Sequence, residues 1–265
     1  MIEVDLAIVG AGLAGCALTR CLGGNGFEGS ILLLEAGRGP GGRASSRRHR
    51  GDSIWRLDHG APALTFSAAP QGALAALLQP LLDQGVLVKE QRPLVWLDGE
   101  AQRIDGPPQG LSYAGSPAMA SLAEALLAQA PERHQSVFGC RLRWLEHSSG
   151  RWLLANTERT ELFAAKRLLL TGTLLAHPRS LKMLAWNDVP LRSAVDEGVD
   201  DDLDKALSLL QHSQAEVRWN LMVDLGVLAL NSEQLPAQIW LDDNAKTRWK
   251  VERLVLQLQS DGRWG

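Results

Sequence analysis

The stretch Val4-Asp5-Leu6-Ala7-Ile8-Val9-Gly10-Ala11-Gly12-Leu13-Ala14-Gly15 decides the fold of this chain of 265 residues. The apolar run at residues 6–9 is typical of a buried parallel strand. The pattern Gly-x-Gly-x-x-Gly follows at once and predicts a tight turn into a helix. Gly10 permits the turn, Gly12 lets a pyrophosphate approach the backbone, and Gly15 lets the helix pack close to the strand. We expect the phosphates to lie at the positive end of the helix dipole.

A second apolar run, Ser-Ile-Leu-Leu-Leu at residues 30–34, ends in Glu35. This glutamate stands about 20 residues after Gly15, where the dinucleotide-binding pattern places an acid on the adenosine ribose. The alternative is a chance glycine turn beside a solvated glutamate. Because strand, turn, helix, strand and acid follow one another in the required order, the sequence favours a dinucleotide site.

The composition excludes several other classes of protein. The chain is 45% hydrophobic and 22% charged, as expected of a globular protein of one or two domains, and its net charge of −3 argues against nucleic acid as a partner. No apolar run is long enough for a membrane span, and residue 1 leads directly into a strand rather than a secretion signal. The three cysteines form no Cys-x-x-Cys pair, so we expect reduced thiols and a cytoplasmic protein.

A glycine-rich loop at residues 37–46 follows the second strand and leads into a cluster of basic residues. Such a density of glycine predicts an irregular loop whose backbone can approach a ligand. Arg43 is fixed beside Gly41 and Gly42, so its guanidinium is a candidate partner for a pyrophosphate. The other arginines, at positions 47, 48 and 50, are interpreted as a solvated basic loop.

These motifs, together with Leu-Asp-His-Gly-Ala at residues 57–61, resemble the flavoprotein amine oxidases, and most closely the renalase-like branch of FAD-dependent oxidoreductases. The resemblance implies FAD as cofactor. It also implies that the loop at residues 41–43 runs past the pyrophosphate towards the flavin and that Gly60 and Ala61 pass close to the flavin ring. The family's following glutamine and aromatic residue are replaced here by Pro62 and Ala63. His59 could act as an acid–base group or be a packed histidine.

A later segment, residues 111–122, is similar to the family's Tyr-x-Gly-x-Pro-Gly-Met-Asn-x-Leu motif. We expect Ser116 to cap a helix that begins at Pro117. The resemblance further implies that the strand at residues 136–146 presents one residue whose backbone contacts the adenine, and Leu142 most nearly occupies that position.

The sequence thus predicts a cofactor site but assigns no catalytic side chain. We predict no metal site, because the six acids between residues 196 and 204 lack the spacing of an oxygen-ligand loop and are interpreted as a linker and a helix start. The expected cofactor-binding residues are Gly10, Ala11, Gly12, Leu13, Ala14, Gly15, Glu35, Ala36, Gly42, Arg43, Gly60, Ala61 and Leu142.

The expected fold class is α/β. A discontinuous Rossmann-like FAD/NAD(P)-binding domain at residues 1–68 and 113–178 is combined with a β-rich α+β substrate domain at residues 69–112 and 179–265. The family's final Gly-Asp motif has no counterpart after residue 180, so we expect the second domain to be C-terminally truncated.

The leading functional hypothesis is an FAD-dependent oxidoreductase that takes a hydride from a small molecule, either an amine or a reduced nicotinamide-type compound. The alternative is a catalytically impaired or non-enzymatic dinucleotide-binding protein. An NAD-dependent dehydrogenase ranks last, since it leaves the motifs at residues 41–43 and 58–61 unexplained. We expect no membrane partner, and the sequence leaves the oligomeric state open.

Overall fold

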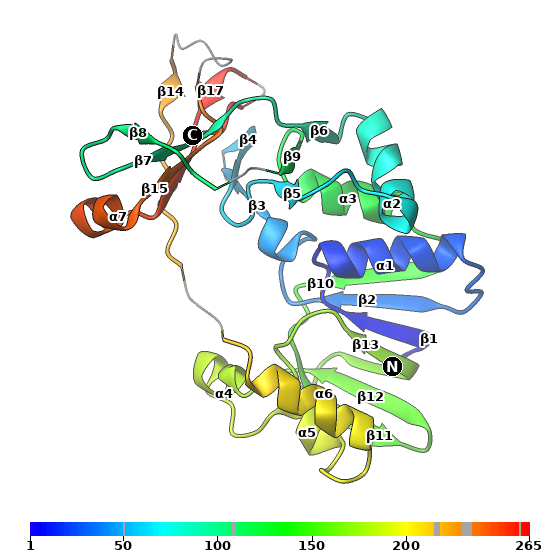
Figure 1. Cartoon of the computed structure of the whole chain (residues 1–265). Coiled ribbons are helices and arrows are strands. Elements are labelled where there is room, and N and C mark those ends of the chain that lie inside the picture. Colours follow the sequence, from blue (N-terminus) through cyan, green and yellow to red (C-terminus); the bar gives the residue numbers. More distant parts are fainter. Residues whose placement is uncertain (50, 108–109, 215–217, 229–234, 260) are drawn as a thin grey trace. The chain divides into compact units, whose positions relative to one another are not determined.

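The computed structural model describes residues 1–49, 51–107, 110–214, 218–228, 235–259 and 261–265. The described chain forms two compact units (Figure 1). The first unit comprises residues 1–42 and 126–219, and the second comprises residues 43–125 and 220–265. Among the described residues, no helix is both long and apolar enough to cross a membrane.

The first unit is built on one six-stranded sheet. In spatial order its strands are β10 (His134–Phe138), β2 (Ile31–Glu35), β1 (Ile2–Val9), β13 (Leu162–Leu170), β12 (Arg151–Asn156) and β11 (Leu142–Ser148). The first four strands run parallel to one another, and β11 and β12 extend the sheet as an antiparallel meander. The predicted α/β class with a parallel, Rossmann-like sheet is therefore confirmed.

Helices cover both faces of this sheet (Figure 1). Helix α1 (Leu13–Gly24) lies on one face and buries Cys16 and Thr19. The other face packs against α5 (Pro190–Ala194) and α6 (Asp201–Gln211), which contribute Leu191 and Leu207 to the main apolar core. A short helix, α4 (Arg179–Leu184), precedes them. The predicted helix start in the acidic stretch is confirmed, because the Asp200 side chain caps α6.

The second unit is rich in strands, as predicted, and the strands in its described part form four small sheets. These sheets are a hairpin of β3 (Ser46–His49) and β4 (Asp52–Asp58); a sheet of β5 (Leu64–Phe66), β9 (Leu111–Gly115) and β6 (Leu87–Lys89); a sheet of β16 (Arg253–Val255), β15 (Gln238–Leu241), β7 (Leu94–Leu97) and β8 (Arg103–Ile104); and a pair of β14 (Gly226–Val227) and β17 (Arg263–Trp264). Its helices are α2 (Gly72–Asp83), α7 (Asp243–Trp249), a 3₁₀ turn that begins at the unit boundary (Gly42–Ala44) and most of α3 (Ala120–Ala128).

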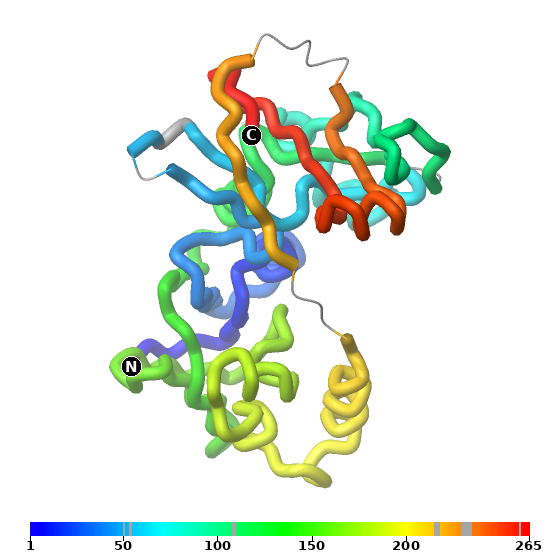
Figure 2. The backbone as a smooth tube through the Cα atoms, turned by 90° about the vertical axis from the view of Figure 1, so that its left-hand side faces the viewer, coloured from blue at the N-terminus to red at the C-terminus, as the bar shows by residue number. Residues whose placement is uncertain are grey.

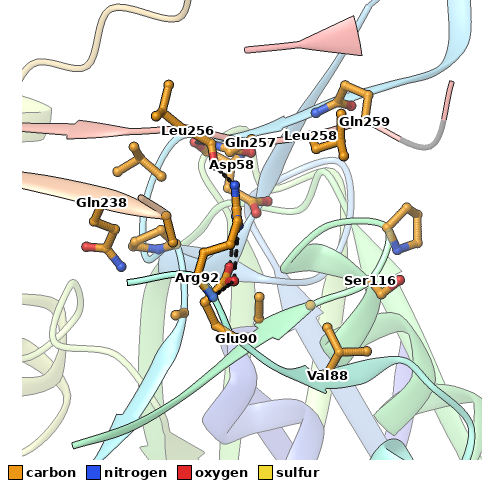
Figure 3. A pocket seen from close by; sticks show the side chains of 17 residues that line it. Asp58, Val88, Glu90, Arg92, Ser116, Gln238, Leu256, Gln257, Leu258 and Gln259 are labelled. Atoms are coloured by element: carbon orange, nitrogen blue, oxygen red, sulfur yellow. Dashed lines mark hydrogen bonds and ion pairs between the residues drawn. The ribbon is translucent and has the colours of Figure 1, made fainter. Parts of the chain in front are cut away.

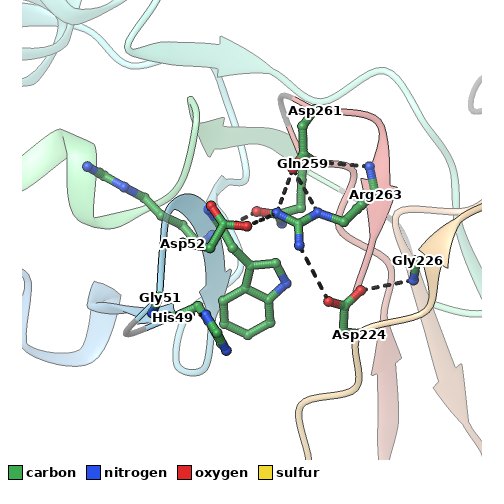
Figure 4. Close-up of polar contacts among 10 residues, drawn as sticks. His49, Gly51, Asp52, Asp224, Gly226, Gln259, Asp261 and Arg263 are labelled. Atoms are coloured by element: carbon green, nitrogen blue, oxygen red, sulfur yellow. Dashed lines mark hydrogen bonds and ion pairs between the residues drawn. The ribbon is translucent and has the colours of Figure 1, made fainter.

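The C-terminal strand β17 is held inside the second unit by charge and by burial. Trp264 is only 2% exposed. The guanidinium of Arg263 contacts three carboxylates, those of Asp261, Asp52 and Asp224 (Figure 4). Figure 2 shows the segment around β14 running beside this strand. Three distant parts of the sequence are therefore fastened together at one guanidinium.

Several sequence expectations differ from the structure. Pro80 lies inside the continuous helix α2, near its end, although the sequence pattern with proline at this position predicts two separate helical pieces. Helix α3 begins at Ala120 and not at Pro117. Its first amides are capped from elsewhere in the second unit: the Met119 N–H donates to Asp58 Oδ1 at 3.0 Å and the Ala120 N–H to Ser46 Oγ at 3.1 Å. The predicted cap at Ser116 is wrong because these long-range acceptors replace it.

The packing boundaries also differ from the domain ranges expected from the sequence. Residues 43–68 and 113–125 pack in the second unit, because β3 pairs with β4 and β9 joins the sheet of β5 and β6. Residues 179–219 pack in the first unit, because α5 and α6 complete the core under its sheet. The assignment of cofactor and substrate roles to the two domains stays a prediction.

Candidate functional site

The glycine loop at residues 10–12 lies at the carboxyl end of β1, where parallel sheets of this kind bind ligands. Gly10 has φ +104°, a conformation that suits glycine, and its N–H donates to the Leu34 carbonyl at 2.8 Å. The hydroxyl of Thr171, just after β13, lies 2.9 Å from the carbonyl oxygens of both Val9 and Gly10. Three neighbouring strands thus fix the turn, and the contribution of Thr171 was not foreseen from the sequence.

Gly15 and Gly12 are glycines for different reasons. A Cβ built on Gly15 would lie 1.9 Å from the Gly10 carbonyl oxygen, so the close packing of α1 on the turn requires glycine. A Cβ built on Gly12 would find its nearest described neighbour, Gly42 Cα, at 3.9 Å, and Gly12 has an ordinary φ of −68°. The fold itself therefore accepts alanine at Gly12. What a Cβ would fill there is the space that a pyrophosphate needs.

The second glycine-rich loop lies directly against the first. Gly41 pairs with Gly12 in an isolated bridge, and its N–H donates to the Ala11 carbonyl at 2.8 Å. The N-terminus of α1, all of whose residues are described, has no side-chain cap and no acidic residue in its first turn. The N–H groups of Leu13 and Ala14 are thus at an uncapped positive helix end, as an anion site requires.

Glu35 closes the edge of the site beside this helix end. One carboxylate oxygen accepts the Ala11 N–H at 2.7 Å, and the other accepts the Gly37 N–H at 2.6 Å. Ala36 follows in the exposed part of the loop. Each carboxylate oxygen has two lone pairs, so Glu35 can hold the loop and still accept a ribose hydroxyl. The structure therefore brings Glu35 and residues 10–15 together.

Leu142 lies at the start of β11 with only 4% of its surface exposed, as part of the main core. Its side chain is thus unable to contact a ligand, and a contact with adenine would have to come from its backbone. The segment that leads from β10 to Leu142 passes beside the end of β2, since the Cys140 N–H donates to the Glu35 carbonyl at 3.0 Å. The expected adenine contact stays a prediction.

Arg43, Gly60 and Ala61 belong to the second unit, where the structure brings them together. The Ala61 N–H donates to the Arg43 carbonyl at 2.8 Å, and a Cβ on Gly60 would lie 2.0 Å from that same oxygen. Gly60 is therefore required by the packing of two main-chain segments. The Arg43 side chain is exposed and so can reach an anion.

Burial shifts the pKa values of two titratable residues beside this segment. His59 Nε2 lies 3.3 Å from Ser45 Oγ, and its buried Nδ1 has no hydrogen-bond partner among the described residues. Burial, and then the charge of Arg47, lower the pKa of His59. Asp58 Oδ1 accepts hydrogen bonds from Ser46 Oγ at 2.5 Å and the Met119 N–H, yet burial raises its pKa.

The second unit contains two cavities that share part of their lining. One has a volume of about 400 Å³ and is lined by Asp58, Ser116 and three glutamines, Gln238, Gln257 and Gln259 (Figure 3). The other, of about 440 Å³, is lined by Trp96, Trp240, Lys89 and Arg253. We call them the Asp58 cavity and the Trp cavity.

An ion pair lines both cavities. The Arg92 guanidinium donates to both carboxylate oxygens of Glu90, at 2.8 and 3.1 Å, and also to the Leu256 carbonyl at 3.1 Å (Figure 3). Burial on its own would raise the pKa of Glu90, but the hydrogen bonds and charge of Arg92 outweigh it and hold that pKa below its usual range. Residues of the motifs at positions 57–63 and 111–122 line parts of both cavities, but the sequence predicted neither cavity.

Comparison with known families decides the type of domain. Residues 8–81 match the family model described as an NAD(P)-binding Rossmann-like domain. The chain contains a Rossmann-like NAD(P)-binding domain. The match covers the glycine loop, Glu35 and the second glycine-rich loop. No curated protein sequence matched the chain.

Among solved structures, the chain is similar to a CLA-producing fatty acid isomerase from P. acnes, with a TM-score of 0.57 and 15% identity over 92% of this chain and 71% of that one. At this identity the similarity establishes a shared fold. A protoporphyrinogen oxidase candidate from Exiguobacterium sp. 255-15 matches with a TM-score of 0.48 and 16% identity over 72% of this chain and 63% of that one. The tetracycline destructase Tet(51) matches with a TM-score of 0.46 and 14% identity over 76% of this chain and 43% of that one. The chain thus spans less than two thirds of these last two proteins.

Proposed function

We propose that this protein is an FAD-dependent oxidoreductase. The observation that carries the proposal is the arrangement at the carboxyl edge of the first sheet. An uncapped helix end, the unfilled space at Gly12 and the Glu35 carboxylate lie together there, as an adenosine diphosphate group requires. The motifs at residues 41–43 and 58–61, which resemble those of flavoprotein amine oxidases, favour FAD over NAD as the complete cofactor.

The residues of the first unit fit the nucleotide part of FAD. The N–H groups of Leu13 and Ala14 would bind the pyrophosphate, and Glu35 would accept a hydrogen bond from a ribose hydroxyl. Gly10 and Gly15 would hold the turn and the helix in place. When bound, FAD supplies the redox chemistry by accepting a hydride, while the protein binds and orients the reactants.

The finer proposal is a renalase-like or amine-oxidase-like enzyme that acts on a small molecule, either an amine or a reduced nicotinamide-type compound. It rests on the resemblance alone. In the same proposal, Arg43, Gly42, Gly60 and Ala61 belong to the flavin side of the cofactor, Ala36 follows the ribose acid and Leu142 contacts the adenine through its backbone. No side chain is assigned a catalytic role, and the cytoplasmic location stays a prediction.

Reconstitution with FAD tests the proposal. We expect purified protein, after incubation with FAD and gel filtration, to retain a flavin with an absorbance band near about 450 nm. Gly12→Ala should remain folded but lose the flavin, because the methyl group fills the space of the pyrophosphate. Gly24→Ala is the matched control, since a Cβ there has no described neighbour within 4 Å and Gly24 lies at the other end of α1.

Two outcomes would contradict the proposal. Folded wild-type protein that retains no FAD excludes it, and calorimetry with ADP then shows whether the dinucleotide-binding alternative survives. Full flavin content in Gly12→Ala would remove the glycine loop from the binding site.

A further inference from the structure

We propose that the Asp58 cavity binds a primary alkylammonium ion, whose charged nitrogen would contact the Asp58 carboxylate. All the residues that line this cavity belong to the second unit. The inference concerns binding alone and does not rest on the proposed function, since no residue of the glycine loop takes part. A volume of about 400 Å³ lies in the range of small-molecule sites.

The Asp58 carboxyl group uses only one of its two oxygens in the described contacts. Oδ1 accepts hydrogen bonds from Ser46 Oγ at 2.5 Å and from the Met119 N–H at 3.0 Å, which occupy both of its lone pairs. Oδ2 has no hydrogen-bond partner among the described residues and is not shut off from solvent. The cap of α3 therefore accounts for Oδ1, whereas Oδ2 is left for a ligand at the cavity wall (Figure 3).

Neighbouring side chains hold this carboxyl group in one position. Gln257 pairs with the main chain of Asp58 through both ends of its amide: Oε1 accepts the Asp58 N–H at 2.8 Å, and Nε2 donates to the Asp58 carbonyl at 2.9 Å. Gln259 Oε1 accepts the Arg56 N–H at 2.9 Å. The segment at residues 257–259 thus fastens the end of β4 along the cavity wall. A ligand would meet a carboxylate that is already in place and would not have to order it.

The charges that line the cavity favour a cation. The lining holds two carboxylates, Asp58 and Glu90, and one cation, Arg92. Arg92 forms a bidentate pair with Glu90, so these two charges cancel. The described partners of the Asp58 carboxyl group, Ser46 and Met119, are both neutral. The raised pKa of Asp58 agrees with a carboxylate that burial disfavours and that no described cation compensates. An incoming ammonium ion would supply the missing positive charge.

The rest of the lining distinguishes between kinds of organic cation. None of the described residues that line the cavity is aromatic, so a quaternary ammonium ion would find no ring face for a cation–π contact. A primary ammonium ion carries three N–H donors. One can bind Asp58 Oδ2, and the side chains of Ser116 and Gln238 offer oxygens for the others (Figure 3).

Aliphatic side chains make up much of the remaining wall. They include those of Pro62, Val88, Ala114, Val255 and Leu258. Such a wall gains from apolar contact with an alkyl chain attached to the nitrogen.

Calorimetric titration of the protein without added flavin, at low ionic strength, tests the inference with four probes that share one alkyl chain. The probes are hexylammonium, 1-hexanol, hexyltrimethylammonium and hexanoate. We expect saturable one-to-one binding of hexylammonium, about tenfold weaker binding of the alcohol and of the trimethyl compound, and no binding of hexanoate. Equal binding of hexylammonium and either of the two weaker probes, or no saturable binding of hexylammonium, would overturn the inference.

Variants locate the site. Asp58→Asn keeps an oxygen that can accept from Ser46 and Met119, but it places an NH₂ group where Oδ2 lay. It should weaken hexylammonium binding about tenfold and leave 1-hexanol binding unchanged. Asp83→Asn is the matched control, because Asp83 is an exposed carboxylate on α2 of the same unit and does not line the cavity.

A second variant covers the case in which Asp58→Asn does not fold. Val88→Lys adds a positive charge at a position of the cavity wall that is 40% exposed, and it should also weaken hexylammonium binding about tenfold. Wild-type affinity for hexylammonium in a folded Asp58→Asn protein, or in Val88→Lys, would exclude the Asp58 cavity as the site of binding.

Discussion

The carboxyl edge of the first sheet and the Trp cavity of the second unit offer ligands opposite kinds of surface. At the sheet edge the ligand would meet main-chain amides, one carboxylate and glycines that leave space. In the cavity it would meet a row of large side chains from β7, β15 and β16. A main-chain site depends on where side chains are missing, so single added methyl groups should disrupt it. A site formed by side chains depends on their charges and on the pairs they make with one another, so replacing a charged side chain by a neutral one should disrupt the site.

We expect the largest effect on stability when the two glycines at the sheet edge, Gly15 and Gly12, are each replaced by alanine. Gly15→Ala forces a methyl group against the Gly10 carbonyl and should destabilise the protein by about 3 kcal/mol or more, whereas Gly12→Ala should leave the melting temperature unchanged. Thermal unfolding followed by circular dichroism measures both. Equal melting temperatures for the two variants would show that α1 does not pack on the turn as described.

The next effect concerns the ion pair that lines both cavities. Arg92→Met leaves a half-buried Glu90 carboxylate without its partner and should cost about 2 kcal/mol, below the usual figure for a fully buried pair because both side chains are partly exposed. The double variant Glu90→Gln/Arg92→Met should recover most of that loss. Denaturant unfolding of the wild type, both single variants and the double variant measures the coupling, and strictly additive losses would contradict it.

A smaller effect is expected at Glu35. Glu35→Ala should weaken FAD binding by about 1–3 kcal/mol, the scale of a hydrogen bond to a charged group. It also removes the acceptor for the Ala11 and Gly37 N–H groups, so Glu35→Gln, which keeps one acceptor oxygen, serves as the control. Titration calorimetry with FAD measures both, and wild-type affinity in Glu35→Ala would remove this residue from the site.

The smallest effect is a pH dependence at Asp58. Burial raises its pKa above 3.8, so the folded protein holds this proton more tightly than the unfolded chain. That contribution to stability is complete below about pH 4 and is lost as the pH rises through the raised pKa. Asp58→Asn keeps an acceptor for Ser46 and should show a smaller fall in unfolding free energy between pH 4 and pH 7.

Comparing the wild type with Asp58→Asn at each pH cancels the opposite contribution of His59 to the free energy of unfolding. Because the pKa of His59 is lowered in the folded protein, protonation of this residue favours the unfolded chain, and its contribution to stability is lost on acidification. Identical pH profiles for the wild type and Asp58→Asn would mean that Asp58 titrates normally in the folded protein.

The sequence predicted the sheet edge well because its parts are close together in the chain and each has a defined spacing. The strands β1 and β2, the helix after Gly12 and the position of Glu35 all follow from local patterns. The start of α3 could not be predicted in this way. Its cap comes from Asp58 and Ser46, more than 60 positions away, and local residues such as Ser116 carry no signal of that.

The Trp cavity could not be predicted for a related reason. Trp96 and Trp240 become neighbours only through the parallel pairing of β7 with β15. The antiparallel pairing of β15 with β16 then places Arg253 beside them. Each residue by itself fits an ordinary amphipathic strand, and the ion pair of Glu90 and Arg92 resembles a surface pair in sequence.

The pair of Glu90 and Arg92 also links the two cavities of the second unit. Both side chains line the Asp58 cavity and the Trp cavity, so a change in the pair alters the walls of both. A compound in either cavity that separated the guanidinium from the carboxylate would meet an electrostatic penalty and would disturb the wall of the neighbouring cavity as well.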